Sequence, residues 1–279
     1  MKKIVISSVI CVLTTAVFAQ DKKVNVGLAY QIGMSFIKAG TNKISPKVGF
    51  NNSIGFNMNI NFNDNIGMNT GLEFDFESNK YEFEKLNGEN YYYFKDKDII
   101  KKEDLGSNAD ASLFSVNERK YKNIFLSIPT MLIFRTNSIG DWRYYGKFGA
   151  RTGFLIKSTM EDDGLTYATN NISLVADENQ SVSSTSSANT AMKVPYGNDV
   201  VVIRSALGLG GGAQWNFTGN TILFADLSFY YGLTPMHVSR DKKDDNMTLF
   251  NRSTDNTTNN YFRFKANQMQ LCLKIGILF

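Results

Sequence analysis

The stretch that decides the fold is VNVGLAYQIGMSF at residues 24–36. Every even position carries a large apolar side chain, and the odd positions carry only Asn, Gly, Ala, Gln or Ser. Because successive side chains of a β-strand point to opposite faces, this segment predicts a strand with one apolar face and one polar face. Strands half-buried in soluble proteins alternate over about 4–8 residues. The longer run here is typical of a strand that crosses a membrane as part of a barrel.

The same alternation recurs along the chain in six further runs, at 48–62, 66–77, 142–157, 201–217, 223–233 and 268–279. A seventh run, at 121–135, is apolar on both faces, so its parity is ambiguous. Short turns fall at 63–65, 137–141 and 218–220, and longer polar segments fall near 38–47, 78–119, 158–199 and 235–260. This spacing predicts an all-β fold, an eight-stranded antiparallel up-and-down transmembrane β-barrel with short periplasmic turns and four longer extracellular loops. An even number of strands leaves both termini in the periplasm of a bacterium, with the barrel in its outer membrane.

The N-terminus has the features of a secretory signal peptide. MKK at 1–3 is basic and 4–18 is mostly apolar. Ala19 ends a cleavage site at which residues with short side chains precede the cut. The apolar run is too short for a helix across a hydrocarbon core of about 30 Å, which needs about 20 residues. We therefore expect residues 1–19 to be removed and 20–279 to form one barrel domain. The nearly balanced charge of the remaining chain argues against a nucleic-acid partner.

The last run ends the chain on an aromatic residue, Phe279. We expect this run to pair with 24–36, since closure removes both edges of the sheet. A terminal aromatic on an alternating strand resembles the signal that the outer-membrane assembly machinery reads. That machinery and the outer-membrane lipid are therefore the first expected partners.

Charged residues at inward positions are the candidate functional set. An eight-stranded barrel has an interior just wide enough for side chains to fill. Opposite charges there should pair, because an unpaired buried charge is costly. We favour an ion-pair plug over an ion path. The predicted network consists of Glu73, Asp75, Lys147, Arg151, Arg204, Asp226 and Lys274.

Two local features of the strands also give expectations. Lys157 has inward parity in its run. Pro129 lies inside a strand, where it cannot donate to the ladder, and therefore predicts a bulge close by.

His237, with Ser239 and Asp241 close by, is the one candidate for catalysis. A histidine can act as a general base only within hydrogen-bond reach of its partners. Three polar residues in one loop are common by chance, so a solvated surface histidine is favoured. No cofactor is expected, because the Gly208-x-Gly210 pattern lies in an alternating strand and lacks the helix that a dinucleotide fingerprint requires. No metal site is expected, since neither Asp96-x-Asp98 nor the cluster from Asp241 to Asp245 has the glycine and terminal glutamate of a calcium loop.

The chain resembles the PorT-like outer-membrane barrel family. The resemblance is carried by LSIPTML at 126–132, GKFGARTG at 146–153, LGLG at 207–210 and YGL at 231–233. It implies a small barrel, and the namesake member of the family assists a protein secretion system. Three functions follow as hypotheses. The favoured one is a non-enzymatic barrel whose loops bind a surface partner or stabilise the envelope; the others are an accessory of secretion or envelope assembly and an enzyme at the barrel rim.

Overall fold

The computed structural model describes residues 24–39, 44–83, 90–93, 99–100, 112–167, 184–192, 200–237 and 266–279. Eight long strands in this part of the chain form the barrel wall. They are β1 (Val24–Ala39), β3 (Gly49–Asn61), β4 (Ile66–Phe83), β7 (Ser112–Arg135), β8 (Trp142–Tyr167), β10 (Ile203–Thr218), β11 (Thr221–Gly232) and β12 (Ala266–Leu278).

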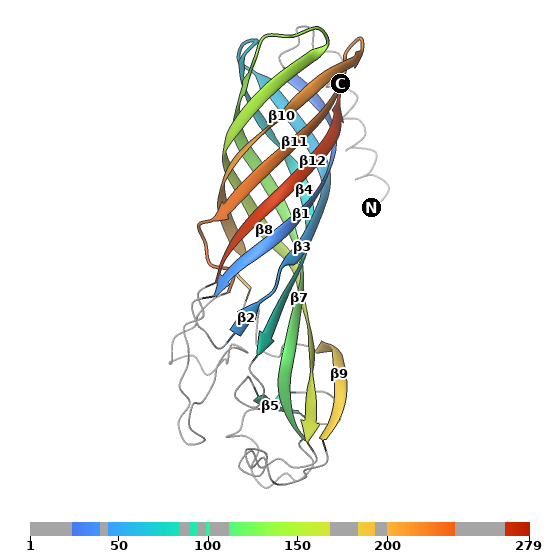
Figure 1. Cartoon of the computed structure of the whole chain (residues 1–279), viewed down its shortest axis with the longest axis vertical. Coiled ribbons are helices and arrows are strands. Elements are labelled where there is room, and N and C mark those ends of the chain that lie inside the picture. The colour runs from blue at the N-terminus through green and yellow to red at the C-terminus, as the bar shows by residue number, and fades with distance from the viewer. Residues whose placement is uncertain are drawn as a thin grey trace, which may run out of the picture.

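The eight strands close into a ring in which each pairs antiparallel with its neighbours in the chain, and β12 returns to β1 (Figure 1). The closing ladder runs from Gly27 opposite Leu278 to Ala39 opposite Ala266. Because the ring has no open edge, the backbone groups of these strands are satisfied within the wall. The eight-stranded antiparallel barrel expected from the sequence is confirmed.

Three tight turns lie at one end of the barrel, together with the C-terminus (Figure 1). In the first, the Asn63 side chain accepts hydrogen bonds from the backbone N–H groups of Asn65 at 3.0 Å and Ile66 at 2.7 Å. Asparagine is favoured in turns because its side chain can bond to the backbone two residues on. Gly140 and Gly219 adopt positive φ angles of 62° and 54° in the other two turns, a conformation that glycine adopts at no steric cost.

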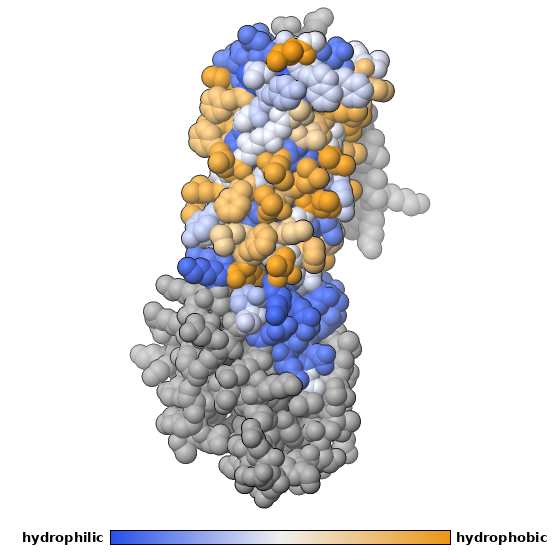
Figure 2. Space-filling view, viewed as in Figure 1, coloured by the Kyte–Doolittle hydropathy of each residue, from blue (hydrophilic) through white to orange (hydrophobic). Residues whose placement is uncertain are grey.

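The outer face of the barrel is apolar. Large side chains at the outward positions are exposed, including Phe50 at 65% and Leu209 at 67%. They form a band around the barrel, which Figure 2 shows on one side. An exposed apolar surface this extensive marks a contact with lipid or protein rather than with water. No helix among the described residues has the length and apolar character needed to cross a membrane.

The wall continues past the apolar band, so the predicted loops at 78–119 and 158–199 were drawn too long. β4 runs to Phe83, β7 begins at Ser112 and β8 ends at Tyr167. Shorter strands join this extension: β2 (Ile44–Pro46) pairs with β4, β5 (Asn90–Tyr93) with β7, β6 (Ile99–Ile100) with β5, and β9 (Ser184–Met192) with β8. A ladder outside lipid needs no apolar outward residues, so hydrophobic alternation fades while the strand continues.

A bulge between β7 and β8 changes one inward assignment. The register shifts so that Ile124 lies opposite Lys157 while Phe125 lies opposite Leu155, leaving Ile156 as the extra residue. Lys157 therefore joins the outward face and is exposed, contrary to the sequence expectation. At Pro129 the β7–β8 register is continuous, so the bulge expected there was misplaced by a few residues.

Candidate functional site

The centre of the lumen holds a group of buried charges from opposite walls. Arg151 on β8 donates through Nη2 to Glu73 at 2.7 Å and to Asp75 at 2.5 Å. Lys274 on β12 donates to the second oxygen of Glu73, and Ser127 on β7 donates to Asp75. All five side chains are buried. These contacts tie β4, β7, β8 and β12 together across the barrel.

A second group extends the network toward the loop end. Arg204 on β10 donates to Glu77 at 2.6 Å and to Gln268 at 3.1 Å, and its guanidinium lies 3.5 Å from Asp75. Gln270 donates to the other oxygen of Glu77 at 2.6 Å. The sequence reasoning left Glu77 out of the ion-pair set, although its period-two spacing from Glu73 and Asp75 was the signal that could have included it.

A third group lies toward the turn end of the lumen. Lys147 forms an ion pair with Asp226 at 2.8 Å, with both side chains almost fully buried. The hydroxyls of Tyr145 and Ser228 donate to the same carboxylate at 3.0 and 2.9 Å. All seven residues of the predicted network thus make charge-paired contacts. Ser127 and Tyr145 were not singled out. Tyr145 has inward parity on β8, beside Lys147 and Arg151, whereas β7, which holds Ser127, carries no predicted member.

The network is balanced in charge. Its carboxylates are Glu73, Asp75, Glu77 and Asp226, and its cations are Lys147, Arg151, Arg204 and Lys274. Removing one member of a buried pair leaves an uncompensated charge, which costs about 3–5 kcal/mol. The arrangement is therefore suited to hold the walls together and to fill the lumen.

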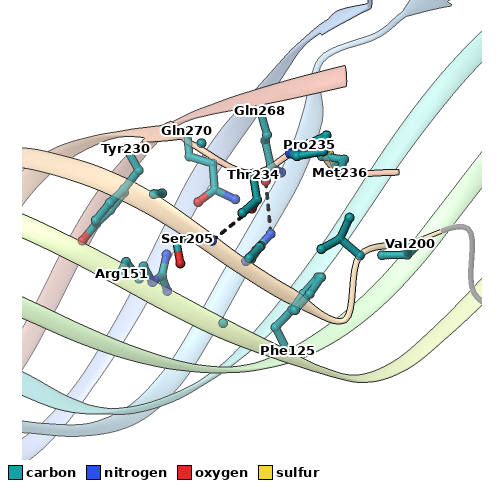
Figure 3. A pocket seen from close by; sticks show the side chains of 15 residues that line it. Phe125, Arg151, Val200, Ser205, Tyr230, Thr234, Pro235, Met236, Gln268 and Gln270 are labelled. Carbon is teal, nitrogen blue, oxygen red and sulfur yellow. Dashed lines mark hydrogen bonds between the residues drawn. The ribbon is translucent and has the colours of Figure 1, made fainter. Parts of the chain in front are cut away.

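Small cavities flank the network on both sides. The larger one, about 30 Å³, lies at the loop end, with Arg151 and Tyr230 on one side and Val200, Pro235 and Met236 on the other (Figure 3). The smaller one, about 10 Å³, lies at the turn end beside Lys147. A cavity needs about 10–15 Å³ of such space to hold one water molecule. Cavities this small accommodate isolated waters rather than an organic ligand.

His237 is buried near the loop end, not solvated as expected. Its Nε2 lies 2.8 Å from the hydroxyl of Tyr81, and its ring lies 5.0 Å from that of Tyr121. The expectation was wrong because the wall continues past β11: Met236 donates its N–H to the carbonyl of Ala266 at 2.8 Å, and His237 bridges to Val200. Ser239 and Asp241 lie outside the described residues. Within the described part of the chain, no cluster of three or more His, Cys, Asp or Glu side chains could hold a metal ion.

Residues 18–238 match the profile of the outer membrane protein beta-barrel domain family. No curated protein sequence matches the chain.

Several solved structures are similar to this one. The Ail attachment invasion locus protein of Yersinia pestis, in complex with the heparin analogue sucrose octasulfate, is 14% identical with a TM-score of 0.30, over 92% of this chain and 99% of that one. OprG from Pseudomonas aeruginosa is 10% identical with a TM-score of 0.39, over 91% and 92%. The outer membrane protease OmpT from Escherichia coli is 10% identical with a TM-score of 0.31, over 92% and 95%.

Proposed function

Because the chain belongs to the outer membrane protein beta-barrel domain family, we propose that it is a closed, non-enzymatic barrel that presents loops at the bacterial surface. In this proposal residues 1–19 are removed during export, and Phe279 is read by the assembly machinery. The tight turns and both termini of the chain face the periplasm. The loops either bind a surface partner or contribute to the structure of the envelope.

The observation that carries the proposal is the neutral ion network across the lumen. Ions need a continuous hydrated path, and here Arg151 spans between Glu73 and Asp75 in the middle of an eight-stranded barrel. Opening a path would require breaking buried pairs at about 3–5 kcal/mol for each separated partner. At that cost an open state would be rarely populated.

Single-channel recording in planar bilayers tests the closed lumen. We expect the wild-type barrel to give no stable, large conductance steps. The variant Glu73→Ala/Lys274→Ala removes an inward ion pair without changing net charge, and we expect it to give small, fluctuating steps.

A matched control is Lys47→Ala/Glu82→Ala, which removes an exposed ion pair of 2.9 Å from the outer face. This control should remain as silent as the wild type. Porin-like steps from the wild-type protein would refute the closed lumen.

An accessory role in protein secretion or envelope assembly is the second candidate, and the PorT-like segments at 126–132 and 146–153 favour it. Deleting the gene should then reduce the amount of secreted protein while other outer-membrane barrels remain at normal levels. A rim enzyme has less support, because His237 is buried against Tyr81. A His237→Ala activity screen would test it.

A further inference from the structure

A group of lysines lies on the outer face where the apolar band ends, on three neighbouring strands. We call Lys80 on β4, Lys120 and Lys122 on β7, and Lys157 on β8 the lysine patch. Figure 2 shows hydrophilic side chains in the region directly next to the band, over the part of the wall where Figure 1 labels β7. Lys157 lies in one row with Phe76 and Ile124, so the lysine patch is continuous with the apolar surface.

The strand register places these cations in a definite order. From the band outward, the rows across β4, β7 and β8 are Phe76–Ile124–Lys157, Ser78–Lys122–Thr159, Lys80–Lys120–Glu161 and Glu82–Glu118–Asp163. On each strand the charged outward residue nearest the band is a lysine, and the carboxylates lie farther out. An anion at the edge of the band would therefore meet positive charge first.

The ion pairs within this surface leave part of its positive charge without a partner. Lys80 and Lys120 lie directly opposite each other, an arrangement of like charges that destabilises a sheet. Glu118 pairs with Lys80 at 2.5 Å, and Glu161 pairs with Lys122. Lys120 and Lys157 form no ion pair with any residue in the described ranges. A bound anion would relieve the repulsion between Lys80 and Lys120.

We propose that the lysine patch binds the phosphate groups of anionic lipids in the leaflet on the loop side of the membrane. Lysine places its alkyl stem along apolar surface while its ammonium reaches the polar headgroup layer, which is the position that these residues occupy. On β1 the outward residue after Phe36 is also an exposed lysine, Lys38, whereas Val202, Ile203 and Leu233, around the start of β10 and after β11, are apolar. The inference rests on the membrane location of the barrel and is independent of its closed lumen.

Native mass spectrometry of the full detergent-solubilised barrel tests this binding, with phosphatidic acid as the probe and phosphatidylcholine as the net-neutral comparison. The test variant is Lys120→Gln/Lys157→Gln, which removes two charges without breaking an ion pair. The control variant Lys23→Gln/Arg143→Gln removes the same charge from the residue before β1 and from Arg143 at the turn end. Each basic residue near an anionic lipid surface raises the binding affinity about fivefold. The test variant lacks two of them and should therefore bind phosphatidic acid about 30-fold more weakly.

Support requires that the control variant binds phosphatidic acid like the wild type and that phosphatidylcholine binding is unchanged in both. Heat-modifiable migration on gels verifies that each variant is folded. Equal losses in the two variants would overturn the proposal, because net charge alone would then explain the binding. Displacement of the lipid by inorganic phosphate at an equal concentration would also overturn it, since the site would then recognise a soluble anion. With the wild type alone, raising the salt concentration should weaken binding; salt-independent binding would contradict the proposal as well.

Discussion

Glu73 is the residue whose loss should weaken the barrel most. It accepts hydrogen bonds from Arg151 and Lys274 and is 2% exposed. The substitution Glu73→Gln keeps the shape and removes the charge, so Lys274 loses its only ion-pair partner among the described residues. Breaking a buried pair in this way costs about 3–5 kcal/mol of unfolding free energy.

Glu82→Gln is the matched control. Glu82 pairs with Lys47 at 2.9 Å, but the two side chains are 45% and 48% exposed. Exposed ion pairs contribute about 0–1 kcal/mol to the free energy of unfolding. The same chemical change should therefore have a small effect on the outer face and a large effect in the lumen.

Urea unfolding of the barrel in phospholipid vesicles measures the difference. The two tryptophans, Trp142 and Trp215, stack at the turn end with ring centroids 5.7 Å apart and provide the fluorescence signal. The free energy of unfolding falls by about 2 kcal/mol per M urea, so Glu73→Gln should lower the urea midpoint of unfolding by about 2 M. In Glu73→Gln/Lys274→Met most of the stability should return, because neither charge is then left alone. If Glu73→Gln unfolds at the same urea concentration as Glu82→Gln, the network does not stabilise the barrel as argued.

The remaining predictions concern closure and packing. Deleting residues 277–279 should abolish the folded, heat-modifiable band in outer-membrane fractions, because Ile277 and Leu278 pair with β1 and Phe279 exchanges backbone hydrogen bonds with Val26. An equal deletion within 168–183 should leave the band intact. A normal band from the chain without 277–279 would show that this strand end is dispensable. Gly208→Val should destabilise the barrel by about 1–3 kcal/mol, since a Cβ there would lie 2.7 Å from the Tyr230 ring, whereas Gly146→Val, which points outward into open space, should not. Equal unfolding midpoints for the two glycine variants would contradict a tightly filled lumen.

The hydrophobic alternation was sufficient to predict the eight strands and the inward position of the network. A period of two links each side chain to a face, and the outward face must be apolar wherever the wall meets lipid. Glu73, Asp75 and Arg151 could therefore be placed in the lumen without knowledge of their partners. Which carboxylate pairs with which cation depends on register and rotamers, and for that reason the sequence could not assign the contact between Arg204 and Glu77.

The errors lie where the outward face no longer meets lipid or where the period changes. Beyond the band the outward residues are charged, as at Lys80 and Glu82, so the continuing strands looked like loops. One extra residue at Ile156 reverses the parity of everything after it in β8, which moved Lys157 outside. His237 was misplaced because nothing in its neighbours indicates that the wall continues past β11.

The β7–β8 hairpin gives the barrel a lever arm. β8 has 26 residues and β11 has 12, so at about 3.3 Å per residue β8 is longer by roughly 46 Å. The two long strands continue into the wall that carries Ser127 and Arg151, with the bulge at Ile156 between the projecting part and the lumen. A small tilt of the barrel would therefore sweep the tip through a wide arc. A lateral pull on the tip would be transmitted along β7 and β8 to the part of the wall that carries these two buried side chains.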